Sequence, residues 1–126
     1  ESLILNKTVS DAFKRAEAYV SAGADGIMIH SKQKTPKEIF KFSKIFKKNF
    51  PTIPLVAVPS SYNKVTEKQL IDNGFNVVIY ANHLLRASYP AMKKTITSIL
   101  KNKRSYEIDN ELMSIKNILE LIPGTK

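Results

Sequence analysis

The sequence predicts an α/β fold in which parallel strands alternate with helices. Three short aliphatic runs, at residues 27–29, 55–58 and 77–80, each stop abruptly at polar residues, and a helical pattern follows each run. Such runs are typical of parallel strands that are buried on both faces. Because sites in α/β proteins collect at the carboxyl ends of the strands, these polar ends predict parts of one shared pocket.

Four βα units account for most of the chain. The expected strands cover residues 2–5, 26–29, 55–58 and 77–80, and the expected helices cover about residues 8–22, 36–48, 66–73, 84–100 and 107–121. The last helix has no strand before it, so it is an extra C-terminal helix. Pro90 lies inside the fourth helix and predicts a break or kink near Ser88, because proline has no backbone N–H to donate.

Candidate caps mark the ends of these helices. The N-terminal candidates are Thr8 or Ser10, Thr35 followed by Pro36, and a capping box from Thr66 to Gln69, and the C-terminal candidates are Gly23 and Gly74. Such local signals predict where each helix begins and ends, independently of the sheet.

Four successive βα units predict a parallel sheet with right-handed crossovers. The first strand begins at the first residue without an entry loop, which leads us to expect further residues of the same fold upstream. The C-terminal half of a (β/α)8 barrel, the TIM barrel, therefore fits better than a complete doubly wound sheet. We expect residues 1–101 to form this half-barrel and residues 102–126 to form a linker and a C-terminal helix.

Composition narrows the classes of protein. The chain has 126 residues, a formal net charge of +9 and no cysteine, which excludes disulfides and thiolate metal sites. No apolar run is long enough for a membrane span, and the N-terminus lacks the pattern of a signal peptide. We expect a cytoplasmic protein that binds no membrane. The lysines of residues 37–48 alternate with apolar positions, which predicts a solvated helix face and no nucleic-acid site.

Several segments together resemble the phosphoenolpyruvate mutase branch of the isocitrate lyase superfamily. They are Glu1-Ser2-Leu3-Ile4, Ala16-Glu17-Ala18-Tyr19-Val20, Ala22-Gly23-Ala24-Asp25-Gly26-Ile27, Ile29-His30-Ser31-Lys32, Val58-Pro59-Ser60-Ser61-Tyr62 and Ala81-Asn82-His83-Leu84-Leu85-Arg86-Ala87-Ser88. The resemblance covers about residues 1–100, in order and with compatible spacing. The ends of the second and fourth expected strands are its most specific parts.

The resemblance implies a (β/α)8 barrel that acts on a small phosphorylated or phosphonate keto acid. It implies a homo-oligomer, a tetramer or a dimer, whose last helix is swapped onto a neighbouring subunit. It also implies Mg²⁺-dependent chemistry in which phosphoenolpyruvate and phosphonopyruvate are interconverted, with the metal polarising enolate oxygens. Phosphonopyruvate hydrolysis and carbon–carbon cleavage are sister activities of the same superfamily.

The chain departs from the family pattern by omission. The family's acidic magnesium ligands, its gating loop and its phosphate-binding arginine all precede the position of Glu1. We therefore expect no metal ligand in this chain, and we expect the chain alone to be inactive without the missing N-terminal half-barrel. The sequence leaves mutase, hydrolase and lyase open, and it also leaves open a non-catalytic half-barrel that serves as a binding module.

His30 is the first candidate for both catalysis and substrate binding. From its sequence position alone, it ends a strand, and neighbouring backbone at the barrel rim could satisfy its imidazole. The resemblance implies that this histidine approaches the phosphoryl group, where an imidazole N–H can donate to an anionic oxygen. Lys32 follows on the same loop and either adds positive potential or is solvated.

Asn82 is the candidate at the end of the fourth strand. Its amide either contacts the substrate or supports a loop, and we retain it as substrate-binding. His83 is expected to orient the turn, and Arg86 either grips a phosphate or forms a structural salt bridge. Ser60, Ser61 and Tyr62 form a hydroxyl-rich loop that either orders water or phosphate or is a plain turn after Pro59.

Overall fold

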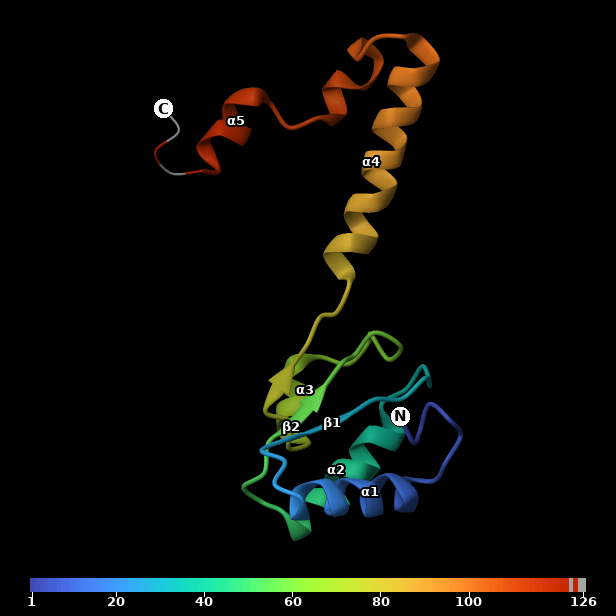
Figure 1. Ribbon diagram of the computed structural model, residues 1–126, viewed down its shortest axis with the longest axis vertical. Helices are drawn as coiled ribbons and strands as arrows, with labels where there is room; N and C mark the ends of the chain where they lie inside the picture. Colours follow the sequence, from blue (N-terminus) through green and yellow to red (C-terminus); the bar gives the residue numbers. More distant parts are fainter. Residues whose placement is uncertain (123, 125–126) are drawn as a thin grey trace. The chain divides into compact units, whose positions relative to one another are not determined.

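The structure is a computed structural model that describes residues 1–122 and 124 (Figure 1). The chain divides into two compact units, Glu1–Ala81 and Asn82–Lys126. The first unit holds a parallel sheet with its helices, and the second is helical.

The first unit contains a three-stranded parallel sheet with strand order β1-β2-β3. Its strands are β1 (Ile27–Ile29), β2 (Leu55–Ala57) and β3 (Val77–Val78), and its helices are α1 (Val9–Ser21), α2 (Lys37–Asn49) and α3 (Glu67–Asp72). Ile29 pairs with Ala57, which in turn pairs with Val78. The three strands are parallel, so their carboxyl ends lie at the same end of the sheet, called the carboxyl edge below. The predicted α/β class and the parallel sheet are confirmed.

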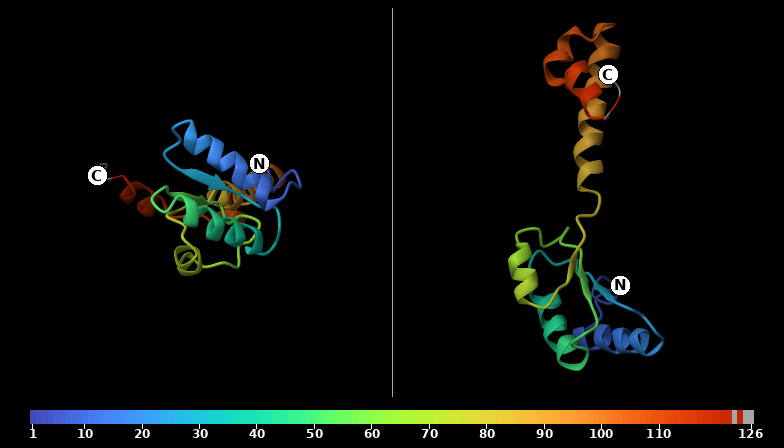
Figure 2. Two further views of the ribbon diagram at one scale, coloured as in Figure 1. Left: turned by 90° about the horizontal axis from the view of Figure 1, so that it is seen from below. Right: turned by 90° about the vertical axis from the view of Figure 1, so that its left-hand side faces the viewer.

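Helix α2 supplies the centre of the core. Ile39, Phe42 and Phe46 recur at helical spacing and are completely buried, together with Leu55 and Ala57 of the central strand. The rings of Phe42 and Phe46 stack with their centroids 5.6 Å apart. Helix α1 packs beside α2 and adds the small buried residues of its own inner face (Figure 2). Burial of this apolar stripe orients α2 on the sheet.

The N-terminal segment corrects the first predicted strand. The sequence predicts a strand at Ser2–Leu5, but residues 2–6 form turns. The backbone N–H of Leu5 donates to the carbonyl of Glu1 at 3.0 Å, and that of Lys7 donates to the carbonyl of Ser2 at 2.9 Å. Because this segment bonds to itself and not to β1, β1 is an edge strand of the described sheet. Three βα units are therefore formed where four are predicted.

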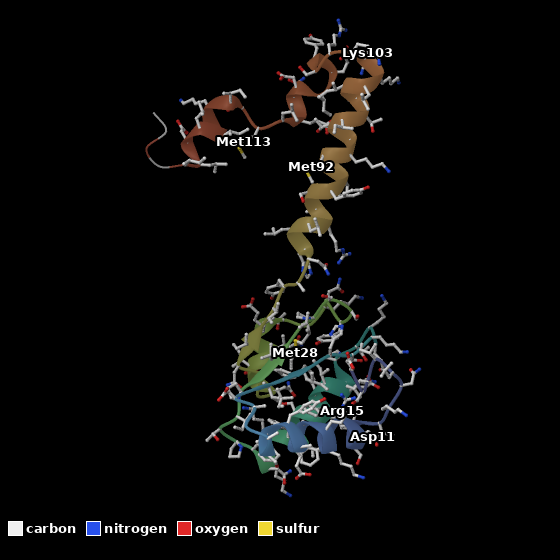
Figure 3. All side chains as sticks on the ribbon, in the orientation of Figure 1. Asp11, Arg15, Met28, Met92, Lys103 and Met113 are labelled. Atoms are coloured by element: carbon white, nitrogen blue, oxygen red, sulfur yellow. The ribbon has the colours of Figure 1, made fainter. Side chains whose placement is uncertain are left out.

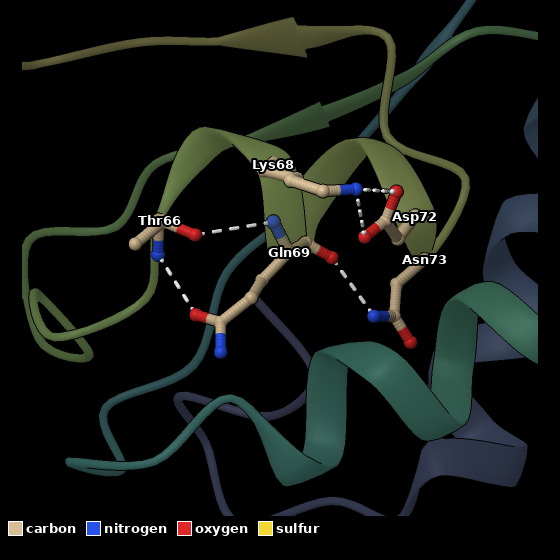
Figure 4. Close-up of polar contacts among 5 residues, drawn as sticks. All are labelled: Thr66, Lys68, Gln69, Asp72 and Asn73. Carbon is tan, nitrogen blue, oxygen red and sulfur yellow. Dashed lines mark hydrogen bonds and ion pairs between the residues drawn. The ribbon is translucent and has the colours of Figure 1, made fainter.

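Capping predictions hold for α1 and α3. At α3, the amide of Gln69 donates to the Thr66 hydroxyl at 3.2 Å, and the Gln69 side chain accepts from the Thr66 amide at 3.0 Å (Figure 4). Gly23 and Gly74 follow α1 and α3 with φ of +97° and +83°, as the sequence predicts. Thr35 is not a cap, because α2 begins at Lys37 and Pro36 occupies the N-cap position.

Lys47 behaves differently from the other lysines of α2. Its ammonium donates to the carbonyl of Ile53 at 2.7 Å and to Asn76 Oδ1 at 3.0 Å. The same Asn76 oxygen accepts from the amide of Leu55 at 3.0 Å. Burial lowers the pKa of Lys47 below its ordinary value. Lys47 thus connects the end of α2 to the segments that lead into β2 and β3, whereas neighbouring Lys48 is exposed.

The second unit corrects two predictions about helices. Helix α4 (His83–Asn102) is continuous through Pro90, so of the break or kink predicted near Ser88 the break does not occur. The predicted helix at 107–121 is two elements, the 3-10 helix η1 (Tyr106–Glu111) and α5 (Ile115–Glu120). Leu112 is extended, with φ −92° and ψ +148°, and Ser114 caps α5 by accepting from the Asn117 amide at 3.2 Å. The new cap explains why the helix restarts.

Few residues of the second unit are buried within it. Ile108 is buried, whereas α4 contributes no buried residue and exposes large apolar side chains such as Met92 (Figure 3). Among the described residues, none of the helices combines the length and apolar character that a bilayer crossing requires.

Replacing Lys47 tests its structural role. We expect Lys47→Met to lower the free energy of unfolding by about 1–2 kcal/mol, because the Ile53 carbonyl loses its charged hydrogen-bond donor. Lys48→Met is the matched control and should change stability little, since Lys48 is exposed. Urea denaturation of the 126-residue chain measures both variants. Equal stability of Lys47→Met and the parent would contradict this role.

Titration of Asp11 tests the capping box of α1. Asp11 accepts from the Thr8 hydroxyl at 2.7 Å and from the Thr8 amide at 3.0 Å, and these bonds lower its pKa below 3.8. Because the pKa is depressed in the folded chain, the stabilisation is present above the unfolded pKa and is lost as the pH falls through the folded value. NMR titration of the carboxyl carbon should show the low pKa.

Two variants make this titration specific. Thr8→Ala removes the hydroxyl donor and should raise the Asp11 pKa toward its ordinary value, whereas Ser10→Ala at the neighbouring position should leave it unchanged. An Asp11 pKa that does not respond to Thr8→Ala would rule out the capping box as its cause.

Candidate functional site

His30 lies immediately after β1, at the carboxyl edge of the sheet. The side chain is half-buried, because the preceding strand carries it from the core toward the edge. Within residues 1–122, its Nδ1 atom is buried and has no hydrogen-bond partner. The alternative in which neighbouring backbone bonds the imidazole therefore finds no support at Nδ1 among the described residues.

Tyr62 reaches the same edge from the loop that follows β2. The parallel pairing of β1 with β2 brings the two carboxyl ends together, so this loop lies next to His30. The ring centroids of Tyr62 and His30 are 6.2 Å apart, and the ring planes are tilted by 46°. Tyr62 is completely buried, and its hydroxyl makes no hydrogen bond with any other described residue. The structure thus brings a phenol and an imidazole together, each with an unsatisfied polar atom.

Burial also controls the acidity of Tyr62. Removal from solvent raises the pKa of its phenol above 10.0, because the phenolate would lose its hydration. The nearby backbone of Val58 offsets part of this increase in the pKa of Tyr62. The two groups do not meet the geometry of a hydrogen bond. Tyr62 is therefore a neutral phenol at physiological pH and can donate a hydrogen bond.

Ser31 anchors the loop that carries His30. Its buried hydroxyl donates to Glu38 Oε2 at 2.6 Å and accepts from the Gln33 amide at 3.1 Å. The Gln33 side chain donates to the other Glu38 oxygen at 2.9 Å. This network ties the loop after β1 to the first turn of α2. Ser31 is therefore a structural residue, and Lys32 beside it is exposed to solvent.

Sequence reasoning missed the role of Glu38 and left Tyr62 unresolved. Glu38 lies in the first turn of α2, where an acidic residue is usual, and its contact with Ser31 has no separate sequence signal. Tyr62 follows a hydroxyl-rich turn, in which Ser60 and Ser61 are half-buried and Tyr62 alone is completely buried. An aromatic residue directly after such a turn is the only signal that the sequence offered.

The remaining candidates belong to the second unit. Asn82 has a left-handed backbone, with φ +54° and ψ +6°, and its side chain does not cap α4. His83 begins α4 and is half-buried. Arg86 is exposed and forms no ion pair within residues 1–122, so the structural salt bridge expected for it is absent there. That Asn82 joins His30 in one site stays a prediction.

The site in the first unit is a polar pair, His30 and Tyr62, at the carboxyl end of the sheet. An imidazole N–H at this position can donate a hydrogen bond to an anionic oxygen. Across the described residues, no group of three histidines or acidic residues is placed to hold a metal ion. Magnesium favours carboxylate and other oxygen ligands, and the His30–Tyr62 pair supplies no carboxylate.

Comparison with known proteins agrees with this geometry. A phosphonopyruvate hydrolase from Variovorax sp. (strain Pal2) is 40% identical over 96% of this chain, and a phosphoenolpyruvate phosphomutase from Tetrahymena pyriformis is 37% identical over 96%. The chain spans only 41% and 39% of these two relatives, so it corresponds to less than half of each.

Solved structures give the same result. A phosphoenolpyruvate phosphomutase from Streptomyces platensis subsp. rosaceus superposes with a TM-score of 0.84 at 33% identity, covering 95% of this chain and 41% of that structure. A phosphonopyruvate hydrolase in complex with oxalate and Mg²⁺ superposes with a TM-score of 0.82 at 39% identity, covering 96% and 42%.

The family match is broad as well as specific. The family model for phosphoenolpyruvate phosphomutase matches residues 1–100, which include the whole sheet, the His30–Tyr62 pair and most of α4. On this match, and on the fold and sequence similarity above, the chain belongs to the phosphoenolpyruvate phosphomutase family.

Proposed function

We propose that this chain is the C-terminal half of a (β/α)8 barrel in an enzyme that interconverts phosphoenolpyruvate and phosphonopyruvate. The family match over residues 1–100 is the observation that carries the proposal. The polar pair at the carboxyl edge of the parallel sheet supports it, because (β/α)8 enzymes place their sites at that edge. The enzyme acts in the cytoplasm as an isomerase of phosphonate biosynthesis.

Phosphonopyruvate hydrolysis is the second candidate. It is favoured by the 40% identity to the Variovorax hydrolase, which is similar to the 37% identity to the Tetrahymena mutase. Both reactions act on the same anionic keto acid, so both require the same recognition of its phosphonate.

Residues at the carboxyl edge have simple roles in this proposal. An N–H of His30 donates to an anionic oxygen of the phosphonate or phosphoryl group, and the amide of Asn82 donates to the same substrate. Such donors stabilise negative charge that develops during transfer of the group. The net charge of +9 further favours an anionic substrate. Mg²⁺ supplies Lewis-acid chemistry in the complete enzyme, and its ligands come from outside this chain.

We propose that a preceding half-barrel pairs with the open side of the edge strand β1. Met28 in β1 is 60% exposed, and β1 has a strand neighbour on one side only. A hollow of about 410 Å³ lies beside this strand, lined by α1 residues such as Ala16 and Tyr19 and by Met28. A further strand with its helix would pair with β1 and fill this hollow. On this proposal, the chain alone is inactive because its substrate site is incomplete.

The second unit is the proposed contact between subunits. Exposed apolar residues line α4 at helical spacing, among them Leu85, Tyr89, Met92, Ile96 and Ile99. We infer that the region of residues 102–126 and this face of α4 pack on a second copy of the chain, forming a dimer or a tetramer. The exposed apolar area supports this assignment, because single domains rarely leave so much apolar surface in water.

Phosphorus NMR tests the reaction. The complete enzyme, given phosphonopyruvate and Mg²⁺, is expected to produce phosphoenolpyruvate, and His30→Gln is expected to slow this production by at least tenfold. Lys32→Gln on the same loop is the matched control, because Lys32 is solvated. Release of inorganic phosphate with pyruvate would instead identify the hydrolase, and no change in the substrate would refute both activities.

Light scattering after size-exclusion chromatography tests the subunit contact. We expect the parent to elute as a dimer or tetramer and Ile96→Glu to shift it toward the monomer, because a charge would be buried in the apolar contact. Thr97→Glu places the same charge at an adjacent exposed position and should leave the mass unchanged. A monomeric parent, or equal effects of the two variants, would contradict the proposed contact.

A further inference from the structure

The His30–Tyr62 pair has a chemical complementarity that goes beyond the proximity of its rings. Both the Nδ1 atom of His30 and the hydroxyl of Tyr62 are buried and have no hydrogen-bond partner in the described part of the chain. A buried polar atom without a partner costs free energy, and native structures rarely retain one. Two such atoms on neighbouring rings, with centroids 6.2 Å apart, suggest that each is the partner of the other.

The donor and acceptor properties of the two groups fit this pairing. A neutral imidazole carries its proton on one nitrogen and accepts a hydrogen bond on the other. Tyr62 is completely buried in a loop beside His30, so its phenol can donate to nothing in the solvent. Donation from the phenol to Nδ1 would satisfy both atoms.

Other polar groups near His30 are already engaged. The Ser31 hydroxyl donates to Glu38 Oε2 at 2.6 Å, and the second Glu38 oxygen accepts from Gln33 at 2.9 Å. Lys32, the nearest cation in sequence, is exposed. Both oxygens of Glu38 therefore already accept hydrogen bonds. The phenol of Tyr62 lies against the His30 ring, and its proton has no acceptor among the described residues.

We propose that Tyr62 is a positioning residue for His30: its hydroxyl donates to Nδ1, directly or through one water, and so keeps the imidazole proton on Nε2. A ring fixed in this tautomer offers a single N–H donor, at Nε2, to an anionic oxygen. The assignment deepens the proposed function and rests on it only for the identity of the anion. Orientation of a histidine by a bond to its second nitrogen is a general device of active sites.

Nitrogen NMR of the imidazole rings tests the proposal without any turnover. The chain contains two histidines, His30 and His83, so ¹⁵N-histidine labelling gives few ring signals, and His83→Gln assigns them. We expect His30 to be predominantly in the Nε2–H tautomer, with Nδ1 shifted as a hydrogen-bond acceptor. In Tyr62→Phe this shift should disappear and the two tautomers should mix.

Controls separate this effect from a general loss of structure. Tyr106→Phe removes the hydroxyl of an exposed tyrosine and should leave the His30 signals unchanged. Circular dichroism reports whether Tyr62→Phe remains folded. If it does not, 3-fluorotyrosine at position 62 retains the ring and makes the phenol a stronger donor, so the Nδ1 signal should move further in the same direction. Identical His30 signals in the parent and the altered Tyr62 protein would overturn the proposal.

Kinetics of the complete enzyme provide a second readout. Tyr62→Phe is expected to lower kcat/KM for phosphonopyruvate about tenfold, as loss of an orienting bond commonly does. In the His30→Gln background the same Tyr62 change should have no further effect, because its action passes through the imidazole. Independent, additive effects would contradict the proposal. If the parent does not convert phosphonopyruvate, the proposed function fails while the NMR result still decides the role of Tyr62.

Discussion

Burial of the apolar face of α2 against the central strand is the interaction on which the first unit depends. Ile39, Phe42 and Phe46 are completely buried together with Leu55 and Ala57. A helix that precedes β2 and packs in this way forces the chain to return parallel to β1. The carboxyl ends of both strands then lie at one edge, and the loops that leave them meet there. The pairing of His30 with Tyr62 is a consequence of this packing.

The amino and carboxyl ends of the parallel strands have different roles. At the amino edge, Lys47 and Asn76 connect α2 to the segments that enter β2 and β3. At the carboxyl edge, Ser31 and Glu38 hold a loop, and His30 and Tyr62 keep polar atoms unsatisfied. Hydrogen bonds at the amino end stabilise the fold. At the carboxyl end, on the proposal above, Tyr62 orients the imidazole of His30 and leaves its remaining N–H for a ligand. Sites at the carboxyl ends of parallel strands are usual in α/β folds.

Local signals in the sequence predicted local structure well. The capping box of α3, the glycines after α1 and α3 and the aliphatic runs of the strands all depend on a few adjacent residues. Non-local features were harder to predict. The segment Ser2–Leu5 has the composition of a strand, but a strand also needs a partner along its edge. Lys47 has the same spacing as its solvated neighbours, and only the fold brings Asn76 to it. The sequence likewise leaves the role of Tyr62 open, because only the parallel pairing of β1 with β2 brings it to His30.

The left-handed backbone of Asn82 has a consequence for evolution at this position. Asparagine is one of the few residues with a side chain that tolerates φ +54°, and glycine tolerates it as well. Selection for backbone shape alone would therefore permit exchange between asparagine and glycine among related enzymes. Selection for the carboxamide would forbid that exchange. Which of the two residues recurs across the lineage thus separates a geometric requirement from a chemical one.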